Sequence, residues 1–380
     1  MRCPHRSEIE VNLACPKSGR ASGRRPVSDH TRTSPRVVAS VAVCTVLTLG
    51  LAGCADDSEG AHPAGRASDQ EVTVYSGRSR PLVEPVLDEF EKASGITVEV
   101  RYGDTAAMAA QLQEEGSRTP ADVFLAQEAG ALGAVAGDDL FAGLPDEVLD
   151  KVPAAYRDEA GQWVGVTGRS RTMVHNVGQV AEDDLPQSVF ELTEPEWKGK
   201  VGIAPTNGSF QAFITAMRVE HGDERTQDFL NGLKTNDAQI REGNAPIVAD
   251  VDEGRLATGL VNHYYVYELA KEKGTTVDAL KAKNHFFPDG DIGALVNVSG
   301  VGVLKGADDD PDARAFVDYL LGRRAQTYFA QETYEYPLVA GVASAPGLPQ
   351  LSSLNTPDID LDDLDDLRTT VEMIRDSGLA

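Results

Sequence analysis

Cysteine is scarce in this chain of 380 residues, and all four copies lie near its start. They are Cys3, Cys15, Cys44 and Cys54. A chain cleaved ahead of Cys54 would keep one cysteine, which excludes a disulfide framework and a thiolate metal site. The stability of the folded part must therefore come from its core.

Apolar runs of membrane-spanning length are missing as well. The stretch from Val37 to Leu51 is too short and too weak for a transmembrane helix. It follows two arginines and ends in Leu51-Ala52-Gly53-Cys54, which is typical of a signal peptide. Because Leu-Ala-Gly-Cys resembles the lipobox of bacterial lipoproteins, we expect a leader at 1–53 and lipidation of Cys54. An ordinary secretory signal with a stray cysteine is the alternative.

The predicted lipid would attach the chain to the outer face of the bacterial cell membrane, in an extracytoplasmic location. Residues 54–70 are rich in Asp, Ser, Gly and Ala, a composition that favours a flexible tether. The remaining residues, from 71 to the end, are enough for two domains.

Basic residues are outnumbered, with 35 Lys and Arg against 60 Asp and Glu and a formal net charge of −25. Residues 1–53 hold eight Lys/Arg and three Asp/Glu, so the rest of the chain carries −30. This charge argues against nucleic acid as a partner. The chain also lacks a nucleophile elbow, an HExxH, a P-loop and a Rossmann glycine fingerprint. These missing motifs argue against an enzyme. We also expect the chain to be a monomer.

Strands and helices alternate from residue 71 onward. We expect strands at 71–75, 96–100 and 121–125, and helices at 81–95, 105–115 and 129–136. This order predicts an α/β fold with a parallel sheet. Ligands of such sheets lie beyond the carboxyl ends of the strands, here at residues 75–78 and 126–128.

The second part of the chain continues the alternation. We expect strands at 163–167, 172–174, 200–204, 256–261, 292–296 and 301–304, and helices after Ser209 and at 226–234, 244–254, 264–273, 310–329 and 367–379. The acidic run 357–366 is expected to be solvated. We predict two doubly wound α/β domains joined by a hinge. The first comprises 71–168 plus about 292–345, and the second 169–291 plus about 346–380.

Tyrosines gather at one point, with three of the ten between residues 264 and 267. Tyr264 and Tyr265 lie where the predicted strand 256–261 meets the helix that Gly274 ends. Neighbouring side chains diverge within a strand or a helix, but a sharp turn can aim both phenol oxygens at one point. Two phenolates form a hard, oxygen-only site of the kind that Fe(III) prefers. Packing in a cleft, or stacking on an organic ligand, is the alternative.

A second polar group precedes the helix after Ser209. Asn207 and Ser209 are good N-cap residues, and the free N–H groups of a helix N-terminus can bind an anion. Capping without a ligand is the alternative reading.

Seven short motifs are distributed along the mature chain. They are Val72–Gly77, Thr119–Phe124, Gly168–Arg171, Trp197–Lys200, Asn262–Tyr267, Ala270–Gly274 and Glu335–Leu338. Together they resemble the periplasmic ferric iron-binding proteins of ABC import systems, within the type II, Venus-flytrap class of solute-binding proteins. The double-tyrosine motif is the most specific of them.

The resemblance implies Tyr264 and Tyr265 as tyrosinate ligands of an Fe(III) cargo that is handed to an ABC permease in the membrane. It implies a synergistic anion, carbonate or phosphate, that completes the iron shell. The positions implied for that anion are Asn207, Gly208, Ser209, Asn244, Asn262 and Arg169.

Three positions depart from the family pattern. Ser79 stands where many members have a histidine ligand, and Gln127 where a glutamate ligand occurs. Glu128, one residue later, reaches the metal only if the local register shifts. His175 stands where a tyrosine is frequent. With Gln127 and Glu128 as the first domain's metal candidates, the protein would hold iron mainly from its second domain.

Two neighbours of the tyrosine pair have competing readings. His263 is a metal ligand or a hydrogen-bonded histidine of the cleft wall, and Tyr267 is a supporting residue or part of the core. The departures also keep a rival function open, the binding of a small organic or oxyanion ligand such as a phosphonate, thiamine or a polyamine.

Overall fold

The computed structural model describes residues 68–380, which lie within one compact unit. The predicted leader 1–53, the lipidation site Cys54 and the tether up to residue 67 lie outside the described residues. Among the described residues, no helix is long and apolar enough to cross a membrane.

Ten strands form the sheet, in the order β2-β1-β3-β9-β4-β7-β5-β6, with β8 and β10 also paired to β4. They are β1 Glu71–Ser76, β2 Thr97–Tyr102, β3 Val123–Ala126, β4 Val164–Asn176, β5 Val201–Ile203, β6 Gln239–Ile240, β7 Thr258–Asn262, β8 Ala282–His285, β9 Val296–Val303 and β10 Tyr336–Pro337. β1 runs parallel to β2 and β3, and β5 runs parallel to β6 and β7, whereas β9 is antiparallel to β3 and β4.

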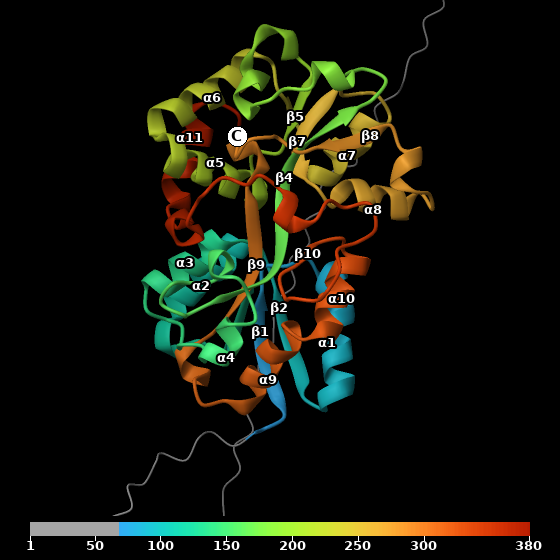
Figure 1. The fold of residues 1–380 in the computed structure, drawn as a ribbon. Helices are drawn as coiled ribbons and strands as arrows, with labels where there is room; N and C mark the ends of the chain where they lie inside the picture. Colours follow the sequence, from blue (N-terminus) through green and yellow to red (C-terminus); the bar gives the residue numbers. More distant parts are fainter. Residues whose placement is uncertain (1–67) are drawn as a thin grey trace, which may run out of the picture. The chain divides into compact units, whose positions relative to one another are not determined.

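Helices lie on both sides of the sheet (Figure 1). They are α1 Arg80–Ser94, α2 Thr105–Glu115, α3 Ala129–Gly137, α4 Asp146–Leu149, α5 Gly208–His221, α6 Asp223–Thr235, α7 Asn244–Asp252, α8 Tyr265–Glu272, α9 Pro311–Leu320, α10 Arg323–Glu332 and α11 Leu367–Asp376. In Figure 1, α2 and α3 lie opposite α1 and α10 across the sheet, and α5 and α6 lie opposite α7 and α8. The predicted α/β fold is confirmed.

β4 corrects the prediction of two short strands at 163–167 and 172–174. It is one strand of 13 residues, and Gly168–Arg171 belong to it. Its first part pairs with β9 up to Ser170, and its second part pairs with β7 from Arg171 onward. The backbone stays extended because a new partner takes over where the old one ends. β10 and β8 also pair with β4, at 167–168 and at 173–176.

The second pair of predicted strands is also wrong, because one strand, β9, replaces them. The predicted strand 292–296 is mostly a 3₁₀ turn, Ile292–Ala294, and the predicted strand 301–304 is the end of a single strand that begins at Val296. β4 and β9 are each buried throughout, and they pair with each other. Figure 1 shows these two strands running through the middle of the molecule. The division into two domains at this point stays a prediction.

Two other predictions need correction. The helix expected at 310–329 is α9 and α10, separated by Gly322, whose extended backbone (φ −76°, ψ 152°) begins the second helix. The acidic run is only partly solvated. Leu361 and Leu364 are buried in a 3₁₀ turn of this segment, and the carbonyl of Leu364 lies directly against Gly130 of α3.

Candidate metal centre

Tyr264 and Tyr265 lie at the predicted junction between β7 and α8. β7 ends at Asn262, Tyr264 caps α8, and Tyr265 is its first residue. Their rings are stacked, with centroids 4.4 Å apart and planes 28° from parallel. Tyr264 is buried and Tyr265 is half-buried. The turn therefore sends both side chains in nearly the same direction, as a site built from two phenols requires.

Burial raises the pKa of Tyr264 well above its usual value, and the neighbouring Tyr265 raises it further. Arg169 and Arg78 act in the opposite direction, and Glu335 adds to the increase. In the metal-free protein at neutral pH, Tyr264 is therefore a neutral phenol with positive charges close by.

Three buried arginines surround the tyrosines, namely Arg78 after β1 and Arg169 and Arg171 on β4. Arg169 and Arg171 are two positions apart in a strand, so their side chains leave the same face. Burial lowers the pKa of Arg171 to about 9, against the opposing effect of Tyr265 and Tyr264. Its guanidinium also lies over the rings of Phe210 and Phe213, 5.7 and 5.5 Å from their centroids.

Arg171 connects β4 to the polar group at the start of α5. It donates to the Ser209 hydroxyl at 3.2 Å, to the Asn262 side-chain oxygen at 3.3 Å and to the Leu260 carbonyl at 3.0 Å. A buried guanidinium held by three oxygens is a rigid donor, which fixes the place of both Ser209 and Asn262.

Asn207, Ser209 and Asn244 form one hydrogen-bonded cluster. The Asn207 side-chain oxygen accepts from the Ser209 backbone N–H at 3.1 Å and lies 2.6 Å from the Ser209 hydroxyl. The Asn244 amide donates to Asn207 at 3.3 Å and to Ser209 at 3.1 Å. Asn207 thus caps α5, as the capping alternative expected. The structure also brings together Asn207, Ser209 and Asn244, which are three of the residues predicted to bind the anion.

Several polar atoms near this cluster have no hydrogen-bond partner within the described part of the chain. They are Nε and Nη1 of Arg169, Nε of Arg171 and the side-chain oxygen of Asn244. A cavity of about 10 Å³, enough for roughly one water, is lined here by Glu128, Arg169, Arg171, Ser209, Phe213, Asn262, Leu295 and Asn297. Unsatisfied buried donors are costly, so a small acceptor-rich ligand would stabilise this corner.

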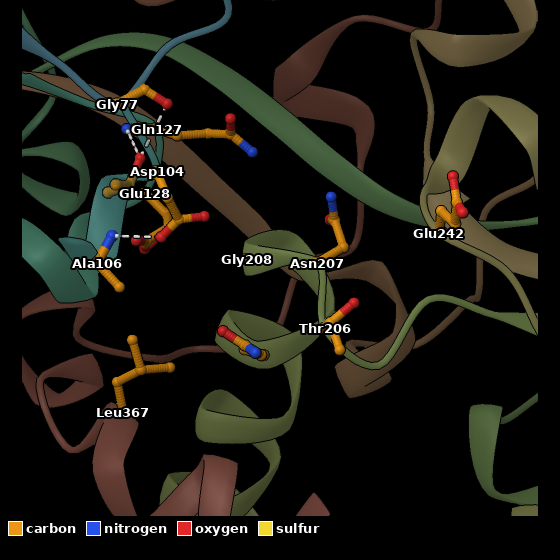
Figure 2. Close-up of a pocket in the computed structure, with 12 residues that line it drawn as sticks. Gly77, Asp104, Ala106, Gln127, Glu128, Thr206, Asn207, Gly208, Glu242 and Leu367 are labelled. Carbon is orange, nitrogen blue, oxygen red and sulfur yellow. Dashed lines mark hydrogen bonds between the residues drawn. The ribbon is translucent and has the colours of Figure 1, made fainter. Parts of the chain in front are cut away.

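Gln127 and Glu128 line a second, larger cavity of about 260 Å³. Asn207 and Gly208 lie on its other side, facing them (Figure 2). Burial raises the pKa of Glu128 to about 7, with Arg169 opposing this effect and Asp104 adding to it. The two candidates from the first half of the chain therefore face the predicted anion residues across a cavity. Neither tyrosine lines it.

His263 is a hydrogen-bonded histidine, and the metal-ligand reading is wrong. Its Nδ1 accepts from the Ser170 backbone N–H at 3.1 Å. Its Nε2, which must therefore carry the proton, donates to the Tyr334 carbonyl at 2.8 Å. Burial lowers the pKa of His263 to about 4, so the ring stays neutral. Both nitrogens are used to hold the turn that precedes Tyr264.

Three other residues considered from the sequence show no side-chain contact with the tyrosine pair among the interactions of the described residues. Tyr267 stacks on Tyr334, with centroids 5.3 Å apart, which matches the packing reading. Ser79 caps α1 without a side-chain hydrogen bond. His175 lies four residues beyond Arg171 on β4, opposite Thr258 and Lys283.

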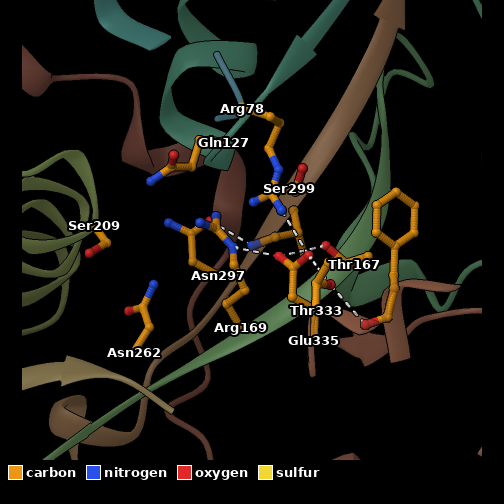
Figure 3. Close-up of polar contacts among 12 residues, drawn as sticks. Arg78, Gln127, Thr167, Arg169, Ser209, Asn262, Asn297, Ser299, Thr333 and Glu335 are labelled. Atoms are coloured by element: carbon orange, nitrogen blue, oxygen red, sulfur yellow. Dashed lines mark hydrogen bonds and ion pairs between the residues drawn. The ribbon is translucent and has the colours of Figure 1, made fainter. Parts of the chain in front are cut away.

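Sequence reasoning missed the part played by Arg78, Arg171 and Glu335. Arg78 donates to Glu335 at 2.7 Å, and the Arg169 guanidinium lies 3.9 Å from the same carboxylate (Figure 3). Arg171 and Glu335 stand in motifs that were noted for the resemblance, but nothing local indicates burial of their charges. Among residues 68–380, no group of three or more His, Cys, Asp and Glu could hold a metal ion.

Comparison with known proteins shows the family of this chain. The family model of bacterial extracellular solute-binding proteins matches residues 118–362. The Fe(3+)-binding periplasmic protein of Serratia marcescens is 32% identical over 314 residues, covering 82% of this chain and 92% of its own length.

Two solved structures share the fold. Iron-bound HitA from Pseudomonas aeruginosa superimposes with a TM-score of 0.76 at 33% identity, covering 81% of this chain and 99% of that one. The Trichodesmium protein IdiA (FutA), in complex with iron and citrate ligands, gives 0.71 at 26% identity, covering 82% and 100%. These relatives are solute-binding proteins rather than enzymes, and the resemblance predicted from the sequence motifs is confirmed. The chain belongs to the bacterial extracellular solute-binding proteins, alongside the periplasmic ferric iron-binding proteins.

Proposed function

We propose that this protein binds Fe(III) through the phenolates of Tyr264 and Tyr265 and delivers it to an ABC permease. One observation carries the proposal, the stacking of two adjacent phenols, 4.4 Å between centroids, at a strand-to-helix turn. Three buried guanidiniums lie around this pair, and Arg169 and Arg78 favour the ionised form of Tyr264. Phenolate oxygens are hard ligands that suit a small, highly charged cation.

A synergistic anion, carbonate or phosphate, completes the iron shell. It is held by Asn207, Gly208, Ser209, Asn244, Asn262 and Arg169. The unpartnered N–H groups of Arg169 support this part of the proposal, since a buried donor gains most from a charged acceptor. The N-terminus of α5, which begins at Gly208, adds its own N–H groups.

The first half of the chain contributes less to the metal. Gln127 offers a neutral oxygen, and Glu128 is a carboxylate buried at the edge of both cavities. The metal is therefore held mainly by residues of the second predicted domain, 169–291 plus about 346–380. Closure of the first domain, 71–168 plus about 292–345, brings Gln127 and Glu128 toward it about the hinge of β4 and β9.

A lipid on Cys54 attaches the protein, as a monomer, to the outer face of the cell membrane. Residues 54–70 then give the protein reach toward the permease. Delivery then needs no diffusion away from the membrane surface.

Titration of the mature protein with ferric nitrilotriacetate tests the iron site. We expect a visible tyrosinate-to-iron charge-transfer band that saturates at one iron per chain and is lost in a Tyr264→Phe/Tyr265→Phe variant. Tyr267→Phe is the matched control and keeps the band, because Tyr267 packs against Tyr334.

Metal analysis of the purified protein separates the rival function. A bound phosphonate, thiamine or polyamine without iron, together with no charge-transfer band in the parent protein, would replace the ferric assignment by an organic-ligand or oxyanion one.

A further inference from the structure

Glu335 is a fully buried carboxylate whose two oxygens each meet one hydroxyl and one guanidinium. One oxygen accepts from the Thr167 hydroxyl at 3.2 Å and lies 3.9 Å from Arg169 Nε. The other accepts from Arg78 Nη2 at 2.7 Å and from the Thr333 hydroxyl at 2.9 Å. Figure 3 shows the carboxylate between the two arginines. Three of these four neighbours donate a hydrogen bond to it, whereas Arg169 forms only an ion pair with it, because its Nε has no hydrogen-bond partner within the described residues.

The backbone around Glu335 is held at two places. On one side, Tyr336 pairs with Gly168 of β4, next to Arg169. On the other side, the carbonyl of Tyr334 accepts from His263, the residue before Tyr264. Tyr334 has φ +59°, a left-handed conformation that a bulky residue adopts only where its surroundings impose it. This segment thus connects the arginine-bearing strand to the turn that carries the tyrosines.

The charges of Arg78, Arg169 and Glu335 do not cancel. Two guanidiniums and one carboxylate leave one positive charge, all three are buried, and all three interact with Tyr264. A higher net positive charge of these three residues would stabilise the phenolates but repel a ferric ion. A lower net charge would leave the phenolates without a stabilising positive charge. Charges act more strongly between buried groups than between exposed ones, and Arg78, Arg169 and Glu335 are all buried.

We propose that Glu335 is a positioning residue for the tyrosine site, which holds Arg78 and Arg169 together and sets the net charge that the phenolates and the metal experience. The inference rests on the proposed iron function. Arg78 comes directly before Ser79, which stands where many members of the family have a histidine ligand. At this point of the first predicted domain, the chain therefore supplies a guanidinium charge in place of a metal ligand.

Glu335→Gln tests the inference because it removes the charge and keeps the size of the side chain. We expect iron still to bind at one per chain, with roughly tenfold lower affinity for one added positive charge. The charge-transfer band should move to shorter wavelength, because the phenolate electrons are held more tightly. Asp250→Asn is the matched control. Asp250 also pairs with two arginines, Arg241 and Arg255, but on α7, and its variant should leave the band in place.

Arg78→Met and the double variant Arg78→Met/Glu335→Gln complete the design. The single variant lowers the net charge and should move the band to longer wavelength. The double variant restores the original net charge and should return the band to its parent position. It also removes both members of a buried pair, which proteins tolerate better than the loss of one. If Glu335→Gln does not fold, two results still test the charge-setting role. They are the shift of the band to longer wavelength in Arg78→Met and its return to the parent position in the double variant.

A band that stays unmoved in folded Glu335→Gln, or that does not return in the double variant, overturns the inference and leaves the iron assignment intact. Absence of the band in the parent protein overturns the iron assignment and this inference together. The three band positions thus distinguish a charge-setting role from a purely structural one, which would change affinity without an ordered shift.

Discussion

At the level of single residues, Tyr264 poses a chemical problem, since a neutral phenol is a poor ligand for a metal. Burial and Tyr265 raise its pKa, and the arginines oppose this without removing it. In the proposed site, iron must therefore displace the phenol protons, and metal binding would release protons. Arg169 and Arg78 lower the cost of that release, while burial keeps the Tyr264 phenol neutral in the absence of metal.

This proton release predicts a steep pH dependence of iron binding. If both phenols lose a proton on binding, the apparent affinity falls roughly 100-fold for each unit of decreasing pH. Competition with nitrilotriacetate between pH 6 and 8, corrected for protonation of the chelator, measures the slope. The Tyr265→Phe variant should show about half the slope on a logarithmic scale. A slope near zero in the parent protein would contradict phenolate coordination.

At the level of helices and strands, local signals predicted most of the elements. Asn207 accepts a backbone hydrogen bond at the start of α5, where an N-cap was expected. The wrong division of β4 into two strands has a clear cause. Whether Gly168–Arg171 is a turn or a strand depends on β9 and β7, which lie about a hundred residues away in the sequence.

The residues of the site also differ in whether their contacts are local or distant in the sequence. The tyrosine pair and the Asn207–Ser209 turn are each local in sequence and were predicted as candidates, and the structure places them near shared arginines. Glu335 meets Arg78 across 257 positions. No pattern around either residue shows the other, so their ion pair could be found only in the fold.

Close packing between α3 and the turn at 361–364 predicts an asymmetry between two glycines of α3. A Cβ on Gly130 would lie 2.2 Å from the Leu364 carbonyl oxygen, whereas nothing lies within 4 Å of one on Gly137. We expect Gly130→Ala to lower the free energy of unfolding by about 1–3 kcal/mol, since the backbone must move.

Gly137→Ala is the control for this prediction, since it should raise the stability by about 0.5–1 kcal/mol through helix propensity. Urea denaturation followed by circular dichroism measures both variants. Equal effects of the two substitutions would show that the turn at 361–364 does not press on α3 in solution.

At the level of the whole molecule, β4 and β9 join the two halves of the sheet, and both halves contribute to the cavity beside the site. Gln127 and Glu128 come from one half, and Asn207 and Gly208 come from the other. A ligand that contacts both halves favours the conformation in which they are close, by as much as its affinities for the two conformations differ. The iron cargo would thus control the shape that a permease meets.

Solution X-ray scattering tests this control of shape. The metal-free mature protein should have a radius of gyration above the roughly 20 Å expected for a compact chain of about 310 residues. Ferric iron with the anion should lower it toward that value, because the phenolates and the anion cluster draw Gln127 and Glu128 inward. The Tyr264→Phe/Tyr265→Phe variant should keep the larger radius under the same conditions, since it cannot hold the metal. An unchanged radius in a parent protein that shows the charge-transfer band would mean that iron binds to one half alone, without closure of the predicted hinge.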